Sequence, residues 1–147
     1  MKTPASIGGH PIHPMLVPIA IGCFLFSFAA DILCLVTGNT DPWNLLAYYT
    51  MIGGIIGALC AAAPGLVDLL SLPQPIRKTA LTHMAINLTV VVLYIVNACL
   101  RYNGGHSLTL PMFLSLIAIL LLLVSGWLGG KMVYELGVGV GAPLPPR

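Results

Sequence analysis

The sequence contains very little charge. Only 7% of its 147 residues are Asp, Glu, Lys or Arg, whereas a soluble domain carries about a quarter. Six Lys and Arg residues against four Asp and Glu residues leave a formal net charge of +2, which is too weak and too scattered for a nucleic-acid-binding surface. Because 58% of the residues are hydrophobic, the composition predicts an integral membrane protein whose main partner is the lipid bilayer.

The sequence also lacks paired cysteines and room for a soluble catalytic domain. The cysteines lie inside apolar runs, and no two of them form a C-x-x-C pair: Cys23, Cys34, Cys60 and Cys99. This pattern indicates neither a disulfide framework nor a zinc knuckle, and we interpret the four as reduced packing residues. Since each membrane crossing needs about 20 apolar residues, four crossings use most of the chain. We therefore expect an electron-transfer or structural membrane protein rather than an enzyme.

Four apolar segments are long enough to cross a membrane, namely residues 14–37, 45–70, 79–100 and 110–131. They are separated by short stretches of turn-forming residues at 38–42, 71–75 and 103–106. Short connections make neighbouring helices antiparallel, and backbone groups in lipid must find hydrogen-bond partners within the chain. The sequence thus predicts a single all-α domain, an integral membrane four-helix transmembrane bundle with antiparallel neighbours.

The positive charges predict an orientation. One side of the predicted bundle carries five of the six, namely Lys2, Arg77, Lys78, Lys131 and Arg147, and the other carries only Arg101. The positive-inside rule then places both termini in the cytoplasm and the protein in the bacterial inner membrane. Residues 136–147 are rich in Gly and Pro, so we expect a flexible tail that a partner protein could hold.

Small residues recur at helical spacing in two of the segments. In the second, a small residue stands at every fourth position: Gly53, Gly57, Ala61 and Gly65. Such a stripe allows the backbone of another helix to approach closely, so it predicts a helix-packing face. The fourth segment repeats the spacing with Gly126 and Gly130.

Polar and ionisable residues gather where the helices end on the predicted cytoplasmic side. His10 and His13 lead into the first helix, Asp68 lies near the end of the second, and His83 near the start of the third. Asn87 follows His83 by one helical turn and can orient it. Because these helix ends share one side of the membrane, the residues are expected to lie at one depth.

Three interpretations of this cluster are open. Two histidines from different helices can supply both axial ligands of haem b, here His13 and His83 with Asn87 supporting them, and the glycine faces would leave space for the porphyrin. The second is a small transition-metal site, with the ligands His10, His13, His83 and Asp68, or a proton-handling role of these residues. In the third, the histidines contact only headgroups and backbone, and Asp68 pairs with Arg77 or Lys78. Asp31, in the outer half of the first helix, either reaches the opposite interface or bonds to Asn97 or Arg101.

Four sequence blocks in order resemble one family. They are HPIHPMLVPIAIG from residue 10, GLVDLL from residue 65, ALTHMAINL from residue 80 and SGWLGGKMVYELGVGVG from residue 125. The chain resembles the four-helix membrane domain of unknown function, family 2231, of bacteria and archaea. The resemblance implies that His10, His13, Asp68, His83 and residues 126–130 are signature positions. The family is similar to membrane b-type cytochromes, and some members occur fused to or beside Rieske-type domains, which implies redox chemistry. Relatives commonly have a histidine before the Gly-Val-Gly-Val stretch, where this chain has Glu135-Leu136.

These observations favour a small haem-binding electron-transfer subunit that works with a redox partner or as a homo-oligomer. The alternatives are a non-catalytic membrane subunit or anchor, acting through helix packing and its C-terminal tail, and a small metal-binding membrane protein. A transporter is disfavoured because four helices seldom enclose a pathway without oligomerising.

Overall fold

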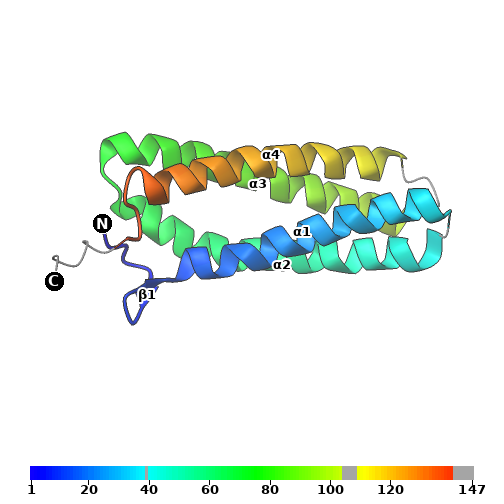
Figure 1. The fold of residues 1–147 in the computed structure, drawn as a ribbon, viewed down its shortest axis with the longest axis horizontal. Helices are drawn as coiled ribbons and strands as arrows, with labels where there is room; N and C mark the ends of the chain where they lie inside the picture. Colours follow the sequence, from blue (N-terminus) through cyan, green and yellow to red (C-terminus); the bar gives the residue numbers. More distant parts are fainter. Residues whose placement is uncertain (39, 104–108, 141–147) are drawn as a thin grey trace.

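Four long helices make up most of the computed structural model, which describes residues 1–38, 40–103 and 109–140. They are α1 (Ile12–Thr37), α2 (Thr40–Ser71), α3 (Gln74–Asn103) and α4 (Thr109–Tyr134). Each is long and apolar enough to cross a membrane. The described residues therefore confirm the predicted all-α transmembrane bundle (Figure 1).

The helices extend beyond the apolar segments predicted for them. Asp41 and Pro42, expected in a loop, lie in the first turn of α2, and Pro75 lies in the first turn of α3. Proline is tolerated there because its missing N–H would have had no partner in the helix, and an acidic residue favours a helix N-terminus. Since α1 begins at Ile12, Pro14 is its third residue and not the expected first. Hydropathy reports the apolar part of a helix, whereas the hydrogen-bonded helix continues into polar residues.

The helices form two antiparallel hairpins, α1 with α2 and α3 with α4. Packing is closest within each hairpin, and the two hairpins contact each other less extensively. Figure 1 shows the N-terminus, the α2–α3 connection and the end of α4 at one end of the bundle, which we call the terminal end. The ends of α1 and α3 and the starts of α2 and α4 lie at the opposite end, the far end. The predicted antiparallel arrangement is confirmed.

The small-residue stripe of α2 faces α1. A Cβ added at Gly57 would lie 3.3 Å from the backbone nitrogen of Ala20, and one at Gly53 would lie 3.5 Å from the sulfur of Cys23. At Gly65 it would lie 2.7 Å from a ring nitrogen of His13, a separation too short for real atoms. The stripe is thus the predicted helix-packing face.

The glycines of α4 at the same spacing do not pack against another helix in the described part of the chain. A Cβ at Gly126 would meet nothing within 4 Å, and one at Gly130 would meet only Tyr134 of the same helix. The glycine of α4 that contacts another helix is Gly129, where a Cβ would lie 3.4 Å from His83. A one-residue step turns a helix by about 100°, so equal spacing alone does not identify the packing face.

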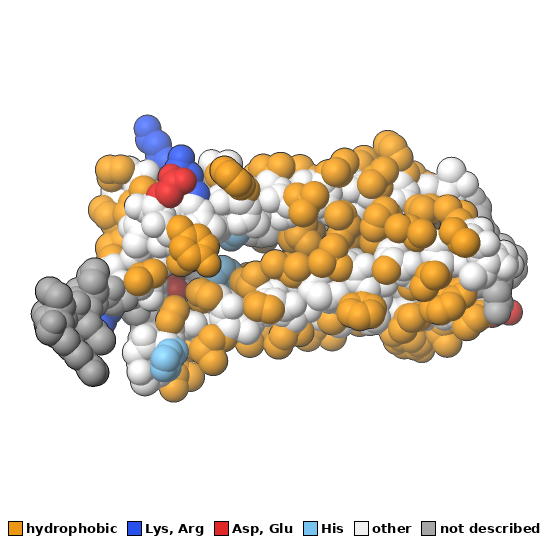
Figure 2. Space-filling view, viewed as in Figure 1, with side chains coloured by type: hydrophobic (Ala, Val, Ile, Leu, Met, Phe, Trp, Pro, Cys, Tyr) orange, Lys and Arg blue, Asp and Glu red, His pale blue; other side chains and the backbone are white. Residues whose placement is uncertain are grey.

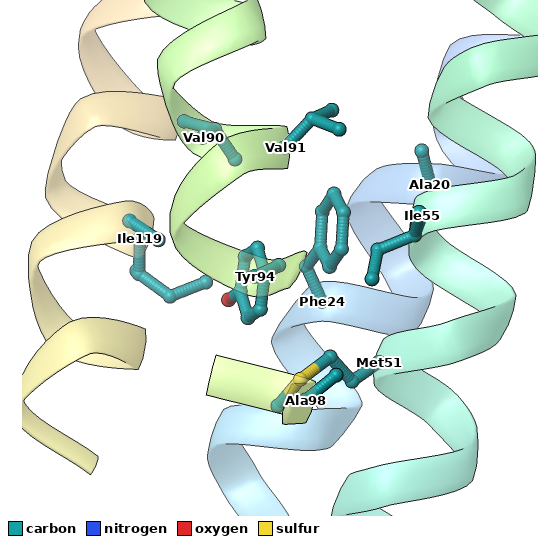
Figure 3. Packing of buried hydrophobic residues seen from close by; sticks show 10 residues of the cluster. Ala20, Phe24, Met51, Ile55, Val90, Val91, Tyr94, Ala98 and Ile119 are labelled. Carbon is teal, nitrogen blue, oxygen red and sulfur yellow. The ribbon is translucent and has the colours of Figure 1, made fainter. Parts of the chain in front are cut away.

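Two apolar clusters join the hairpins. The larger is centred on Phe24 of α1 and Tyr94 of α3, whose rings stack with centroids 4.0 Å apart (Figure 3). The smaller lies at the terminal end and contains Leu69, Leu72, Ala80 and Met132.

A short β-hairpin precedes α1, which the sequence analysis did not predict. β1 (Ser6–Ile7) pairs antiparallel with β2 (His10–Pro11) through a turn at Gly8 and Gly9. Both glycines have positive φ, 58° and 84°, the conformation that a two-residue hairpin turn with two left-handed residues requires.

The first part of the C-terminal tail is packed against the terminal end. The N–H of Val138 donates to the carbonyl of Met132, and the N–H of Gly139 donates to the carbonyl of Met1, both at 2.9 Å. Leu136 and Val138 also pack on the smaller apolar cluster. Residues 136–140 therefore have defined contacts with the terminal end, and residues 141–147 lie outside the described part of the chain, so the flexibility of the tail stays a prediction.

Candidate functional site: a histidine pair between two hairpins

His13 and His83 lie opposite each other across the boundary between the hairpins. Their ring centroids are 6.3 Å apart, and the ring planes are nearly perpendicular, at 87°. Figure 2 shows a hollow between the hairpins with histidine atoms at its edge. The fold therefore brings together the two histidines that the sequence analysis paired.

The ring of His13 is held by the small-residue stripe of α2. Its Nδ1 lies 2.7 Å from the carbonyl oxygen of Ala61. Because a carbonyl only accepts hydrogen bonds, Nδ1 carries the hydrogen and the neutral ring presents a lone pair at Nε2. Gly65 gives the ring its space, since no side-chain carbon fits there. Ala61 and Gly65 thus fix both the position and the tautomer of His13.

The ring of His83 is held on both sides. Its Nδ1 lies 2.9 Å from the carbonyl oxygen of Ser125 in α4 and 2.9 Å from the hydroxyl of the same residue. The carbonyl again requires the hydrogen on Nδ1, so Nε2 is the acceptor. Asn87 donates its side-chain N–H to this Nε2 at 3.0 Å, which confirms the predicted contact between the two residues.

The two histidines differ in their remaining capacity for bonding. Among the described residues, nothing donates a hydrogen bond to Nε2 of His13, while both ring nitrogens of His83 are engaged. Ser125, which holds His83, was missed by the sequence analysis. The sequence feature that could have indicated this role is the position of Ser125, a polar residue inside the apolar fourth segment.

Asp68 forms a hydrogen bond with the N-terminal segment and none with His13 or His83. Its buried carboxylate accepts a hydrogen bond from the backbone N–H of Ala5 at 2.9 Å. The pairing with Arg77 or Lys78 is not formed. Arg77 instead donates to the carbonyl of Leu70 at 2.6 Å.

His10 is also apart from the pair, because it lies in β2 with an exposed side chain. In the described residues, no group of three or more His, Cys, Asp or Glu side chains is placed to hold a metal ion. The four residues proposed as metal ligands are therefore not assembled into one group. His106 of the α3–α4 connection lies outside the described part.

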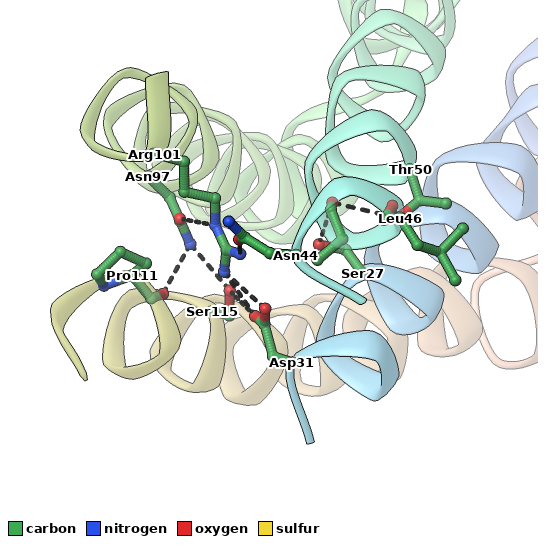
Figure 4. Close-up of polar contacts among 10 residues, drawn as sticks. Ser27, Asp31, Asn44, Leu46, Thr50, Asn97, Arg101, Pro111 and Ser115 are labelled. Atoms are coloured by element: carbon green, nitrogen blue, oxygen red, sulfur yellow. Dashed lines mark hydrogen bonds and ion pairs between the residues drawn. The ribbon is translucent and has the colours of Figure 1, made fainter. Parts of the chain in front are cut away.

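A second buried polar site lies at the far end, around Asp31 and Arg101. The guanidinium of Arg101 contacts both carboxylate oxygens of Asp31, at 2.7 and 2.8 Å, and each side chain is only 2% exposed. Arg101 also donates to the side-chain oxygens of Asn44 at 2.8 Å and Asn97 at 2.9 Å (Figure 4). Of the alternatives left open for Asp31, the structure shows the contact with Arg101.

The fourth helix completes this site. Asn97 donates to the carbonyl of Pro111 at 2.7 Å and to the hydroxyl of Ser115 at 2.9 Å, and Ser115 donates to Asp31 at 3.3 Å. We call this group the far-end clasp, consisting of Asp31, Asn44, Asn97, Arg101 and Ser115. It contains residues from all four helices, and the sequence analysis missed Asn44 and Ser115.

Four apolar helices of spanning length, arranged as two antiparallel hairpins around buried polar side chains, define a multi-pass membrane protein. A family model described as a predicted membrane protein, DUF2231, matches residues 9–142, and the chain belongs to this family. The matched range includes all the signature positions that the resemblance implied, namely His10, His13, Asp68, His83 and residues 126–130. No similar protein was found among curated proteins or among solved structures.

Proposed function

We propose that the protein binds haem b between its two hairpins, with His13 and His83 as the iron-binding residues, and that it transfers electrons in the bacterial inner membrane. The observation that carries this proposal is the shared geometry of the two rings. Each is oriented by a backbone carbonyl at Nδ1, which places the ring's lone pair on Nε2; at His83 the Asn87 amide, 3.0 Å from that nitrogen, would have to turn away for a metal to bind. Histidines that bind metals are typically held in this way.

The distance between the rings is compatible with one shared iron. Metal–imidazole bonds are about 2 Å long, so two rings on opposite sides of one ion have centroids about 6 Å apart. The observed separation is 6.3 Å. The hollow beside the rings in Figure 2 supports the same interpretation.

The donor set favours haem over a bare metal ion. A zinc site takes four ligands, and the described residues provide two histidines without a third donor beside them. A porphyrin supplies four nitrogens of its own and needs only axial ligands from the protein. When bound, haem iron supplies a one-electron redox couple. The glycines were expected to leave space for the porphyrin. In the structure, Gly65 and Gly129 instead make space for the histidine rings.

The charges support a cytoplasmic terminal end. Lys2, Arg77, Lys78 and Lys131 belong to the elements at this end, whereas Arg101 at the far end is paired with Asp31 and buried. Among the described residues, the far end therefore has no unpaired Lys or Arg. This increases the difference in positive charge between the two ends, on which the positive-inside rule depends. A redox partner would then meet the protein at the cytoplasmic terminal end. A C-terminal reporter that is active only in the periplasm would contradict this orientation.

The test of haem binding is the absorption spectrum of the protein purified in detergent from iron-replete cells. We expect a Soret band and a haem extractable with pyridine. His13→Ala should abolish the band, and His83→Ala should alter it. His10→Ala is the matched control, because His10 is exposed in β2 and should leave the spectrum unchanged.

A colourless wild-type protein that also fails to take up added haem would overturn the proposal. That result would favour the alternative of a non-catalytic membrane subunit, in which the histidines only join the hairpins.

A further inference from the structure

We propose that the contact between the N-terminal segment and the C-terminal tail is a releasable latch, which closes the boundary between α1 and α4 at the terminal end. We call this contact the strap; it consists of Met1 with residues 137–140. When the strap releases, the two hairpins part on that side and expose His13. The proposal goes beyond the proposed function and does not depend on haem.

The two hairpins are equivalent halves of the bundle. One shift of 70 positions relates residues of α1 to the residues that they face on α3: His13 to His83, Phe24 to Tyr94 and Asp31 to Arg101. A second constant shift relates residues of α2 that hold α1 to residues of α4 that hold α3: Ala47 to Pro111, Ala61 to Ser125 and Gly65 to Gly129. In membrane transporters built from repeats, one repeat rocks against the other as a rigid body. The hairpins are therefore the units expected to move.

The repeat makes the two boundaries between the hairpins equivalent, α1 with α4 and α2 with α3. At the far end both boundaries are closed by the far-end clasp. Ser115 of α4 donates to Asp31 of α1 at 3.3 Å, and Arg101 of α3 donates to Asn44 of α2 at 2.8 Å. At the terminal end the chain itself closes the α2–α3 boundary, because a short connection joins these two helices.

The strap closes the α1–α4 boundary at the terminal end. The N–H of Gly139 donates to the carbonyl of Met1 at 2.9 Å, and the amino group of Met1 donates to the carbonyls of Gly137 and Val140 at 2.6 and 2.7 Å. These bonds join the chain before α1 to the chain after α4. The described members of the smaller apolar cluster come from α2, α3, α4, the α2–α3 connection and the tail, so this cluster does not hold α1.

The strap is the closure that opens most easily. The bonds of the Met1 amino group are exposed, and exposed hydrogen bonds open first in local fluctuations. The ion pair of the far-end clasp is buried, with Asp31 and Arg101 each 2% exposed. The hairpins therefore part at the terminal end while the far end acts as the pivot. Parting enlarges the hollow between the hairpins, which has histidine atoms at its edge (Figure 2).

The experiment measures distances between spin labels by pulsed electron paramagnetic resonance, in the full chain with its four native cysteines replaced by alanine. Met15→Cys/Trp127→Cys labels the α1–α4 boundary beside the histidine pair, and both positions are exposed. The repeat supplies the matched pair on the α2–α3 boundary, Ala63→Cys/Ala85→Cys, also at exposed positions.

A glycine substitution breaks the strap. Gly139 has a φ of 77°, which strains any side chain, and an added Cβ lies 3.4 Å from Pro11. Gly139→Val should lengthen the distance across the α1–α4 boundary and leave the distance across the α2–α3 boundary unchanged. Gly38→Val is the control, because Gly38 also has a positive φ, 66°, but follows α1 at the far end. It should change neither distance. No lengthening in Gly139→Val, or equal lengthening at both boundaries, would overturn the latch.

A disulfide supplies the opposite test. A Cβ at position 139 lies 3.8 Å from Cβ of Pro11, within the range that disulfides span. In Pro11→Cys/Gly139→Cys, without spin labels and in the same background, the readout is the rate at which diethyl pyrocarbonate modifies His13. The exposed His10 serves as the internal reference in mass spectrometry. Oxidation should slow modification of His13 several-fold relative to the reduced protein.

Equal rates in the oxidised and reduced protein would overturn the latch, and failure to form the disulfide would contradict the contact itself. Neither readout needs haem. A colourless protein that shows both effects would overturn the proposed function and leave the latch intact.

Discussion

The two buried polar sites of this protein differ in whether all of their hydrogen-bonding atoms have partners. In the far-end clasp, both oxygens of Asp31 and all three guanidinium nitrogens of Arg101 have partners. In the histidine pair, Nε2 of His13 has none among the described residues. A site with satisfied groups can hold helices together, whereas a site with a spare lone pair can also bind something. The comparison therefore supports a structural role for the far-end clasp and agrees with the binding role proposed for the histidine pair.

The physical basis of the clasp is the membrane around it. Charged and polar side chains in a bilayer are costly unless they find partners, and each member of the clasp finds at least one on another helix. Breaking a buried ion pair by removing one partner leaves an uncompensated charge. The clasp should thus be the most sensitive part of the bundle.

The largest expected effect comes from neutralising one side of the clasp. Asp31→Asn leaves the Arg101 charge buried without its carboxylate and should lower the free energy of unfolding by about 3–5 kcal/mol. The measurement is unfolding of the purified protein in mixed detergent micelles. The double variant Asp31→Asn/Arg101→Gln removes both charges and should regain a large part of the loss. A single variant as stable as the wild type would contradict the role given to the clasp.

The next effect tests the space for the His13 ring. Gly65→Ala puts a carbon where it would lie 2.7 Å from Nδ1, so the ring must move, with an expected loss of about 1–3 kcal/mol and of haem binding. Gly126→Ala is the matched control on α4, because an added carbon meets nothing there, and it should be neutral or slightly stabilising. Equal behaviour of the two variants would show that His13 does not depend on Gly65.

A smaller effect is expected at Asp68, which joins neither polar site. Asp68→Ala removes the acceptor for the N–H of Ala5 and should destabilise by about 1 kcal/mol, with faster proteolysis of residues 1–11. Asp68→Asn keeps a side-chain oxygen and should behave like the wild type. A spectral change in Asp68→Ala with the N-terminal segment still protected would instead connect Asp68 to the histidine pair.

The smallest effect is expected for the exposed ion pair at the C-terminal end of α4. Lys131 and Glu135 are one helical turn apart, and Nζ of Lys131 lies 4.0 Å from a carboxylate oxygen of Glu135. Their side chains are 45% and 62% exposed. Glu135→Gln should therefore change the free energy of unfolding by less than about 0.5 kcal/mol in the same assay. A loss of unfolding free energy as large as that of Asp31→Asn would contradict the expected difference between buried and exposed ion pairs.

Local sequence patterns predicted much of the bundle. Long apolar segments and short turns were enough for four antiparallel helices, and one-turn spacing was enough for the contact between His83 and Asn87. Shared depth in the membrane made Arg101 one of the expected partners of Asp31, beside Asn97 and the opposite interface, and the structure forms the pair with Arg101. These features depend on hydropathy, spacing and charge, all of which are local properties of the chain.

The contacts of the other polar residues depended on the tertiary structure. The sequence alone did not show that Asp68 binds the backbone of Ala5, that His10 is held apart in a β-hairpin, or that Ser125 holds His83. In a soluble helix the apolar face marks the side that packs, but a helix in lipid is apolar all round, so its pattern does not say which way it turns. The sequence therefore determined how many helices span the membrane and in which order. Only the packing of the two hairpins decided that Gly129, and not Gly126, faces His83. It also decided that, of the two facing histidines, His13 is the one whose Nε2 has no partner among the described residues.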